Sequence, residues 1–318
     1  MALYIGVDGG GSKTEVMIFD DESRQMALSS GPASNPNTVG TENSVAAVTS
    51  LINQGLGKLN STAERIRGLS LCMAGVDRPS QAQILHGLFQ EKYPETSVEV
   101  TNDAFAALSA GTHGESGIVL IAGTGSIAVG EGRRGDTARA GGYGNLVGDE
   151  GSGFDIGRQG LMAAVQYVEG RGEKTDLWHL ASESFELRHP SDLIPRVYDS
   201  VHPVGTVASF ARYVLEAARY DEVAKGVVRN GAENLARMVE SVRHQLHDDV
   251  SNRVVLSGSL LTQSEMLYDR LRLSLQSVFP LAKAERLAER PSAGAVQRAR
   301  RLVNPTLSPE FISASPAC

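Results

Sequence analysis

Two glycine-rich turns, each lying between short apolar runs, are the segments best suited to chemistry. The first, Asp8–Thr14, reads DGGGSKT, and the second, Gly123–Ser126, reads GTGS. Glycines let backbone N–H groups approach an anion, and such turns bind phosphate. An apolar run on each side predicts two strand–turn–strand hairpins. Their recurrence about a hundred residues apart favours two related lobes with one turn each, although two such hairpins can also arise independently.

Other phosphate-binding loops fit these turns less well. A Walker A loop places its lysine directly after the last glycine and continues into a helix, whereas Ser12 separates Gly11 from Lys13 and a strand is expected next. The second turn fits the dinucleotide pattern G-x-G-x-x-[GA], but residues 129–132 are not helical in character. The remaining interpretation is a hairpin turn that binds phosphate, with Asp8 close to a metal ion.

Asp103 is the strongest candidate for a catalytic group. It follows the apolar run at residues 98–100 and precedes a segment expected to be helical, so its carboxylate is expected beyond the carboxyl end of a strand. A general base must lie within about 3 Å of the group whose proton it accepts. An Asp at this position can equally be a helix N-cap, and the spacing alone leaves both roles open.

Composition limits the class of protein. The chain has 318 residues, of which 41% are hydrophobic and 21% charged, enough for a core in each of two domains. Its net charge of −7 and the lack of a basic block argue against nucleic acid or an anionic membrane as a partner. No apolar run approaches the ~20 residues of a membrane span. The amino terminus is unlike a signal peptide, and Cys72 and Cys318 lack metal-ligand spacing, so a cytoplasmic protein is expected.

Apolar spacing predicts the elements that position these residues. Strands are expected at residues 66–72, 98–100 and 254–256, and helices at 44–59, 104–110, 154–168 and 223–246. Residues 170–210 show no regular pattern, and residues 304–318 are expected to form a loose tail. The alternation of strands and helices predicts an α/β fold.

Six segments, taken in order, carry a family resemblance. They are Asp8–Thr14, Thr101–Ala104, Ala122–Ser126, Gly142–Gly144, Gly148–Ser152 and Leu256–Ser259. Together they resemble the N-acetylglucosamine kinase branch of the benzoyl-CoA reductase activator-type ATPase family, within the superfamily of sugar kinases, actin and heat-shock ATPases. The resemblance implies two ribonuclease-H-like lobes, residues 1–113 and 114–303, with ATP in the cleft between them. The last helix is expected either to stay with the larger lobe or to return to the first.

The resemblance also implies an activity and a site. It implies an ATP-dependent kinase, a homodimer, that transfers the γ-phosphate of ATP to the 6-hydroxyl of N-acetylglucosamine, with Asp103 as general base and Asp8 organising Mg²⁺. The nucleotide contacts that it implies are Asp8, Gly10, Gly11, Ser12, Thr124, Gly125, Ala208 and Gly258. The sugar contacts that it implies are Asn35, Asp103, Ser126, Gly142, Tyr143, Gly144 and Asp149.

Alternatives stay open at this point. The acceptor could be glucosamine, N-acetylmuramate or another hexose. The family also contains ATPase activators for electron transfer, which hold an iron–sulfur cluster between subunits through two cysteines. Cys72 in an apolar run and Cys318 at the end of the chain give that function little support. A nucleotide-gated binding module without a sugar substrate is the third possibility.

Overall fold

The computed structural model describes residues 2–247 and 249–305 and divides into two compact units. The first unit comprises the residues up to Gly117 together with those from Leu287 onward, and the second comprises Ile118–Arg286. Each unit has its own five-stranded mixed sheet and its own hydrophobic core. None of the helices in the described ranges has the length and apolar character of a membrane span.

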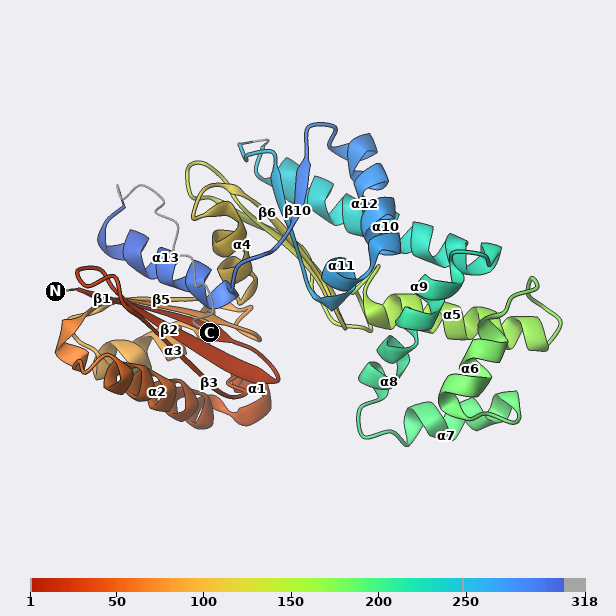
Figure 1. The fold of residues 1–318 in the computed structure, drawn as a ribbon, viewed down its shortest axis with the longest axis horizontal. Helices are drawn as coiled ribbons and strands as arrows, with labels where there is room; N and C mark the ends of the chain where they lie inside the picture. The colour runs from red at the N-terminus through yellow and green to blue at the C-terminus, as the bar shows by residue number, and fades with distance from the viewer. Residues whose placement is uncertain (1, 248, 306–318) are drawn as a thin grey trace. The chain divides into compact units, whose positions relative to one another are not determined.

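The first unit is a sheet with helices on both faces (Figure 1). Helices α2 and α3 pack on one face, and α4 and α13 pack on the other (Figure 1). Its strands are β1 (Leu3–Gly9), β2 (Lys13–Asp20), β3 (Met26–Pro32), β4 (Ile66–Met73) and β5 (Ser97–Thr101). Its helices are α1 (Pro36–Val39), α2 (Thr41–Lys58), the 3-10 turn η1 (Ala63–Arg65), α3 (Pro79–Lys92), α4 (Ala104–Thr112) and α13 (Pro291–Val303).

The strand order of this sheet is β3-β2-β1-β4-β5. Strands β1, β2 and β3 are antiparallel neighbours, and the first glycine turn joins β1 to β2, as the sequence predicts. Strands β1, β4 and β5 are parallel, so their carboxyl ends lie at one edge of the sheet. The loops that follow these three strands therefore meet at that edge.

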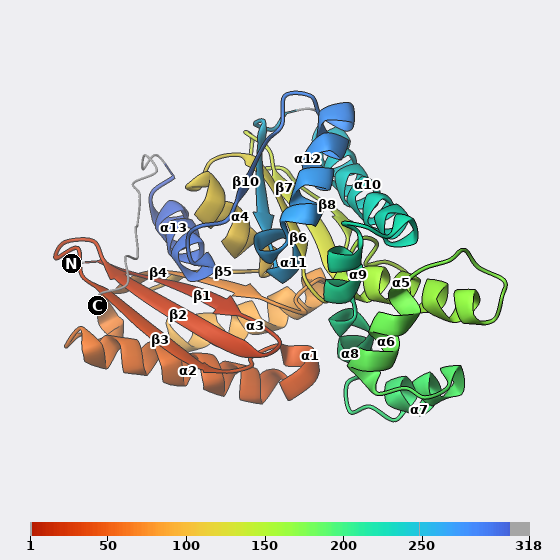
Figure 2. The same ribbon diagram turned by 45° about the vertical axis from the view of Figure 1, so that its right-hand side comes forward.

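The second unit repeats this topology. Its strands are β6 (Gly117–Ala122), β7 (Ser126–Glu131), β8 (Thr137–Gly141), β9 (Arg253–Ser257) and β10 (Lys283–Arg286). Their order, β8-β7-β6-β9-β10, matches that of the first sheet strand for strand. The second glycine turn joins β6 to β7 as the first joins β1 to β2, which is the relation that the repeated turns predict. Figure 2 shows this sheet with the long helix α10 (Glu222–Gln245) beside it.

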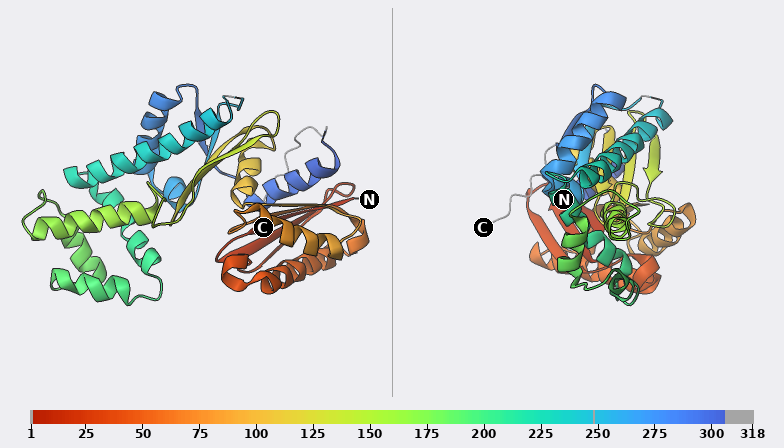
Figure 3. Two further views of the ribbon diagram at one scale, coloured as in Figure 1. Left: turned by 180° about the vertical axis from the view of Figure 1, so that it is seen from behind. Right: turned by 90° about the vertical axis from the view of Figure 1, so that its right-hand side faces the viewer.

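Helices make up the rest of the second unit (Figure 3, green to blue). Besides α10 they are α5 (Gly153–Val168), α6 (Leu177–Phe185), the 3-10 turn η2 (Pro190–Asp192), α7 (Leu193–Tyr198), α8 (Pro203–Ser209), α9 (Ala211–Ala217), α11 (Ser259–Gln263) and α12 (Glu265–Val278). Residues 170–210, whose sequence shows no regular pattern, thus contain helices α6, α7 and α8. Helices α6, α7 and α8 have at most 9 residues, too few for a 3.6-residue apolar period to stand out. The predicted tail lies almost wholly outside the described residues.

Close backbone contacts fix α13 against the first sheet and α4. A methyl group on Gly6 in β1 would lie 2.2 Å from the Val296 nitrogen of α13. On the other side of α13, a methyl group on Gly294 would lie 2.1 Å from the Ala106 carbonyl oxygen of α4. Only glycine allows this packing, because no real Cβ approaches backbone so closely. The helix therefore holds the carboxyl-terminal segment against the strand that leads into the first glycine turn.

Substitution of Gly294 tests this packing. Gly294→Ala is expected to destabilise the protein by about 2 kcal/mol or more, because the added methyl forces α13 away from α4. The matched control is Gly87→Ala in α3, where nothing lies within 4 Å of the added methyl. That change is expected to stabilise by about 0.5–1 kcal/mol through helix propensity. Urea unfolding measures both; equal effects of the two substitutions would contradict the packing.

Candidate active site

The carboxyl edge of the first sheet brings four loops together. The register pairs Asp8 of β1 with Cys72 of β4, and Cys72 with Thr101 of β5. Strands two apart are separated by about 10 Å, so side chains that follow β1 and β5 can face a common ligand. Backbone hydrogen bonds join the loops at this edge, because the Ala74 N–H donates to the Gly9 carbonyl (2.7 Å) and the Ser34 N–H to that of Gly10 (3.3 Å).

Asp8 and Asp103 form a pair of half-buried acids at this edge. Burial, then the charges of Asp103 and Glu15, raises the pKa of Asp8 to about 7, with Lys13 acting in the opposite direction. Burial, then the charge of Asp77, raises the pKa of Asp103 to about 6. Carboxyl groups with pKa values close to neutral at the edge of a sheet are typical of proton-transfer and cation sites.

The carboxylate of Asp103 is not the cap of the following helix. It makes no capping hydrogen bond to α4; instead the Ala104 N–H donates to Asn102 Oδ1 at 2.9 Å. The Asn102 amide in turn donates to Asp77 Oδ1, also at 2.9 Å. Asn102 thus accepts the hydrogen bond of the first N–H of α4, while the Ala104 and Asp103 N–H groups lie close enough to the Asp103 carboxyl to oppose the rise in its pKa.

Asn35 lies in the same group of loops. It is the N-cap of α1, with its Oδ1 accepting from the Asn37 N–H at 2.9 Å. A methyl group on Gly75, in the loop after β4, would lie 2.3 Å from Asn35 Oδ1. The Asn37 amide donates to the Gly75 carbonyl at 2.9 Å. The β4–α3 loop therefore connects the Asn35 turn to Asp77 and, through Asn102, to the segment that carries Asp103.

The remaining turn residues of the first unit are more open. Gly10 is half-buried, and Gly11 and Ser12 are exposed at the tip of the hairpin, where the Gly10 N–H donates to the Lys13 carbonyl at 2.9 Å. Their N–H and hydroxyl groups are accessible to an anion. No three His, Cys, Asp or Glu side chains in the described ranges form a cage for a metal ion. A lone carboxylate such as Asp8 suits Mg²⁺, which keeps water and phosphate oxygens as most of its ligands.

The second unit binds its glycine turn to the loop that follows β8. The Ser126 N–H donates to Asp149 Oδ1 (3.1 Å), and the Ser126 hydroxyl donates to the Glu150 carbonyl (2.9 Å). The Gly153 N–H at the start of α5 donates to the Gly123 carbonyl (2.8 Å). Asp149 is buried and has a left-handed backbone (φ 61°), and burial raises the pKa of its carboxyl. These contacts hold Thr124, exposed at the tip of the turn, in a fixed frame.

Arg139 shapes the glycine loop at residues 141–144. Its guanidinium donates to the carbonyls of Gly141 and Gly142 and lies 5.3 Å from the centroid of the Tyr143 ring. Gly141, Gly142 and Gly144 all have positive φ, so the loop follows a path that side chains rarely permit. Tyr143 is 67% exposed despite this contact, so its ring is available to a ligand.

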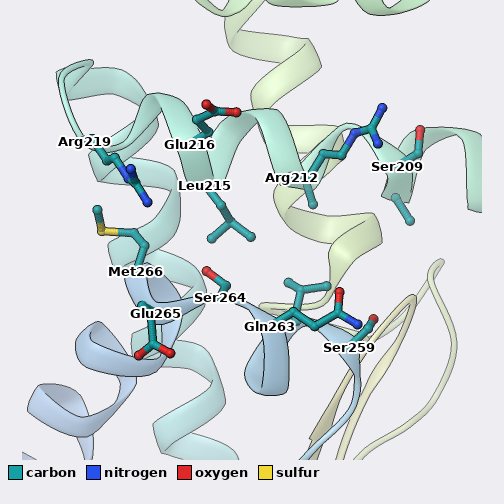
Figure 4. A pocket seen from close by; sticks show the side chains of 13 residues that line it. Ser209, Arg212, Leu215, Glu216, Arg219, Ser259, Gln263, Ser264, Glu265 and Met266 are labelled. Carbon is teal, nitrogen blue, oxygen red and sulfur yellow. The ribbon is translucent and has the colours of Figure 1, made fainter.

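A pocket of about 660 Å³ lies beside the predicted adenosine contacts. Figure 4 shows Arg212, Leu215 and Glu216 of α9 on one side, facing the segment from Ser259 to Met266 on the other. Ala208 lines the pocket. A methyl group on Gly153 would lie 3.6 Å from the Ala208 Cβ and 2.9 Å from the Gly123 carbonyl, which places this pocket beside the second glycine turn. Its size and mixed apolar and polar lining suit a nucleoside.

Gly258 shapes the same region without lining the pocket. It has φ 88°, and a methyl group there would lie 2.3 Å from the Ala122 carbonyl oxygen. Only glycine lets β9 turn into α11 this close to the end of β6.

The predicted residues thus fall into two groups, one in each unit. Asp8, Gly10, Gly11, Ser12, Asn35 and Asp103 gather in the first unit, and Thr124, Gly125, Ser126, Gly142, Tyr143, Gly144, Asp149, Ala208 and Gly258 belong to the second. Sequence reasoning missed Asp77, Arg139 and Arg212. Their spacing in the sequence does not identify them as site residues, because the loops and helices around them come together only when the chain folds. Asn102 lay inside a recognised segment, but only the structure shows its capping bond.

The duplicated 3-2-1-4-5 sheets define the class of protein, which is the actin-like ATPase fold. A ROK family glucokinase from Streptomyces griseus, solved with glucose and AMPPNP, shares it with a TM-score of 0.54 at 19% identity, over 94% of this chain and 98% of that one. A solved structure from Chromobacterium violaceum matches with a TM-score of 0.72 at 24% identity, over 93% of this chain and 98% of that one.

Sequence similarity then gives the family. The BadF/BadG/BcrA/BcrD ATPase family matches residues 5–296, and the chain belongs to it. The N-acetylmuramic acid/N-acetylglucosamine kinase of Clostridium acetobutylicum is 34% identical over 94% of this chain and 99% of its own length. The N-acetyl-D-glucosamine kinase of Dictyostelium discoideum is 30% identical over 92% of this chain and 96% of its own length.

The raised pKa values of Asp8 and Asp103 predict a pH-dependent cost to stability. An ordinary Asp titrates near 3.8, so from about that pH up to about 7 the folded protein binds more protons than the unfolded chain and loses stability as pH rises. Asp8→Asn and Asp103→Asn remove this loss. In thermal unfolding without ligand, each variant is expected to gain several degrees over the wild type at pH 8 and much less at pH 4.

The exposed Glu91 of α3 provides the control for this series. Glu91→Gln is expected to follow the wild type at both pH values. A constant difference between wild type and the Asp variants from pH 4 to pH 8 would contradict the electrostatic account.

A larger side chain at Ala208 tests the nucleotide pocket. Ala208→Phe places a ring in the space that we assign to adenosine and is expected to weaken ATP binding about 10-fold or more, as measured by calorimetry. Ala282, which packs beside the core of the same unit and does not line the pocket, provides the control in Ala282→Val. Unchanged ATP affinity in Ala208→Phe would place the nucleoside elsewhere.

Proposed function

We propose that this protein is an ATP-dependent amino-sugar kinase that transfers the γ-phosphate of ATP to the 6-hydroxyl of N-acetylglucosamine. The observation that carries the proposal is Asp103, a half-buried acid that does not cap its helix and whose pKa is raised to about 6. Full-length similarity to two kinases of N-acetylated amino sugars supports the substrate class.

In this proposal both glycine turns contact one ATP molecule. Gly10, Gly11 and Ser12 offer N–H and hydroxyl donors to the phosphates from one unit, and Thr124 and Gly125 offer them from the other. The adenosine occupies the pocket beside Ala208, bounded by the turn at Gly258. Asp8 would hold Mg²⁺ through water, and the bound ion supplies neutralisation of the phosphate charge.

Asn35, Ser126, Gly142, Tyr143, Gly144 and Asp149 are the proposed sugar contacts. The ring of Tyr143 offers an apolar face to the sugar, and Asn35 and Asp149 offer acceptors to its hydroxyls. Once the 6-hydroxyl lies in line with the γ-phosphorus, its oxygen forms the new P–O bond as the bond to ADP breaks. The hydroxyl proton passes to the carboxylate of Asp103, which is largely ionised above pH 6 and so can accept it.

We also propose that the protein is a homodimer and that it works in the cytoplasm. The cluster-holding ATPase activator is the alternative from another class. Its support is weak because the described cysteine, Cys72, is buried and burial raises the pKa of its thiol to about 12, whereas a cluster ligand must be a thiolate.

The direct test measures ADP release with a panel of sugars. ATP turnover in the presence of Mg²⁺ is expected to rise sharply with N-acetylglucosamine and not with its 6-deoxy analogue, which lacks the accepting hydroxyl. Asp103→Asn is expected to lower kcat by about 100-fold or more, because it removes the base, while ATP affinity changes little.

Glu91→Gln is the matched control, since it neutralises an exposed carboxylate of the same unit, and wild-type turnover is expected. A rate of ADP release that is the same with and without every sugar tested would contradict the proposed function. Near-normal turnover in Asp103→Asn would be compatible with the kinase activity but would show that Asp103 is not its general base.

A further inference from the structure

An arginine of α13 forms a largely buried ion pair with the strand that leads to Asp103. The guanidinium of Arg298 donates to Glu99 of β5 through two nitrogens, Nε to Oε2 (2.9 Å) and Nη2 to Oε1 (2.6 Å). Only 13% of the arginine side chain and 21% of the glutamate side chain are exposed. A bidentate pair of this kind fixes the orientation of the two side chains as well as their distance.

The pairing keeps the Glu99 carboxyl in its charged form. Burial acts to raise the pKa of this carboxyl, but the charge and hydrogen bonds of Arg298 and a hydrogen bond from the Ser70 hydroxyl of β4 (2.8 Å) bring the pKa below its ordinary value. The ion pair therefore persists at neutral pH, and it contributes to holding β5 against α13.

The same guanidinium also contacts the helix that follows Asp103. Its Nη1 lies 3.5 Å from the Ser109 hydroxyl oxygen of α4, and its Cζ lies 5.3 Å from the centroid of the Phe105 ring. A cation over an aromatic ring is attracted by the negative face of the ring. Helices α13 and α4 pack side by side on one face of the first sheet (Figure 1). Arg298 thus connects the strand before Asp103 with the helix after it.

Asp103 has little freedom of its own between these two elements. Strand β5 ends at Thr101 and α4 begins at Ala104, so Asn102 and Asp103 form the whole connection. The backbone of Asp103 already has the right-handed helical conformation (φ −59°, ψ −26°), so its Cα moves with the first turn of α4. A shift of α4 relative to β5 therefore moves the Asp103 carboxylate by a similar distance.

We propose that Arg298 is a positioning residue for Asp103: by bridging β5 and α4 it holds the carboxylate where it can accept the proton of the sugar hydroxyl. The inference rests on the proposed function, in which Asp103 is the general base. Misplacement of a reacting group by about 1 Å can slow catalysis about 100-fold. Because an apolar pair of similar volume often stabilises a fold as well as a buried ion pair does, stability alone gives little reason for this arrangement.

The test combines steady-state kinetics on N-acetylglucosamine and ATP with urea unfolding. Arg298→Met is expected to lower kcat about 10-fold to 100-fold while both KM values change little, because Arg298 belongs to neither proposed binding site. Arg298→Lys keeps a charge beside Glu99 but lacks the planar guanidinium, so it is expected to recover most of the stability and only part of kcat. Arg298→Met combined with Glu99→Gln leaves neither charge without its partner and is expected to regain stability without regaining kcat.

Arg300 provides a matched control on the same helix. Its side chain is 6% exposed, pairs with Asp21 (2.9 Å) and lies with its Cζ 5.3 Å from the centroid of the Phe19 ring. It therefore resembles Arg298 in burial and in the kind of contact, but it joins α13 to the end of β2 instead of to β5 and α4. Arg300→Met is expected to lower stability as Arg298→Met does and to keep the wild-type kcat.

Amide hydrogen exchange gives a readout that does not depend on activity. The Phe105 and Ala106 N–H groups in the first turn of α4 donate to the carbonyls of Asn102 and Asp103, each at 3.1 Å. Both groups are expected to exchange about 10-fold faster in Arg298→Met, because the turn opens more often, and close to the wild-type rate in Arg300→Met.

Equal losses of kcat in Arg298→Met and Arg300→Met would overturn the inference. So would a kcat fully restored by Arg298→Lys or by the added Glu99→Gln, since Arg298 would then contribute stability alone. A wild type whose ADP release is the same with and without every sugar would contradict the proposed function and not the bridge, which the exchange rates at Phe105 and Ala106 test separately.

Discussion

The pairing of Asp8 with Asp103 at the edge of the first sheet is the constraint on which the rest of the site depends. Burial of these two carboxyl groups, with the charge of Asp103 acting on Asp8 and that of Asp77 acting on Asp103, raises the free energy of the folded protein when they are ionised, and no Lys or Arg of that edge neutralises them fully, since both pKa values stay raised. Such a cost is tolerable where a ligand brings the missing charge or proton. A cation beside one carboxylate and a proton transferred from a substrate hydroxyl to the other would relieve both.

The first unit is organised to keep those two acids in place. Helix α13 packs backbone to backbone on β1 and α4, the strand and helix next to Asp8 and Asp103, and the β4–α3 loop links both ends of the site through Gly9 and Asn102. The second unit uses the same sheet topology differently. There the loop from Gly141 to Gly151 is held by Arg139 at one end and by Asp149 and α10 at the other, and its outer residues stay exposed. In our account, the first unit supplies fixed chemistry and the second supplies selectivity.

Much of this could be predicted from the sequence, and the limits have physical causes. The hairpins around Gly10 and Gly125, the long helix after Asp221 and the sheet edge at Asp103 follow from local patterns of glycine and apolar residues. Helices α6, α7 and α8 could not be predicted because they are too short to show a period. Asp77, Arg139 and Arg212 lie on loops or helices distant in sequence from the segments they face, so no local pattern reveals them. At Asp103 the sequence left both a helix cap and a base open, and the hydrogen bond from the Ala104 N–H to Asn102 is visible only in the structure.

The most direct measurement is a crystal structure of the protein with Mg²⁺, a non-hydrolysable ATP analogue and N-acetylglucosamine. Our account predicts that the Gly10–Ser12 and Gly123–Gly125 turns contact the same triphosphate. It also predicts that the 6-hydroxyl lies within about 3 Å of the Asp103 carboxylate. A triphosphate held by one turn alone, or a sugar whose 6-hydroxyl lies away from Asp103, would contradict it.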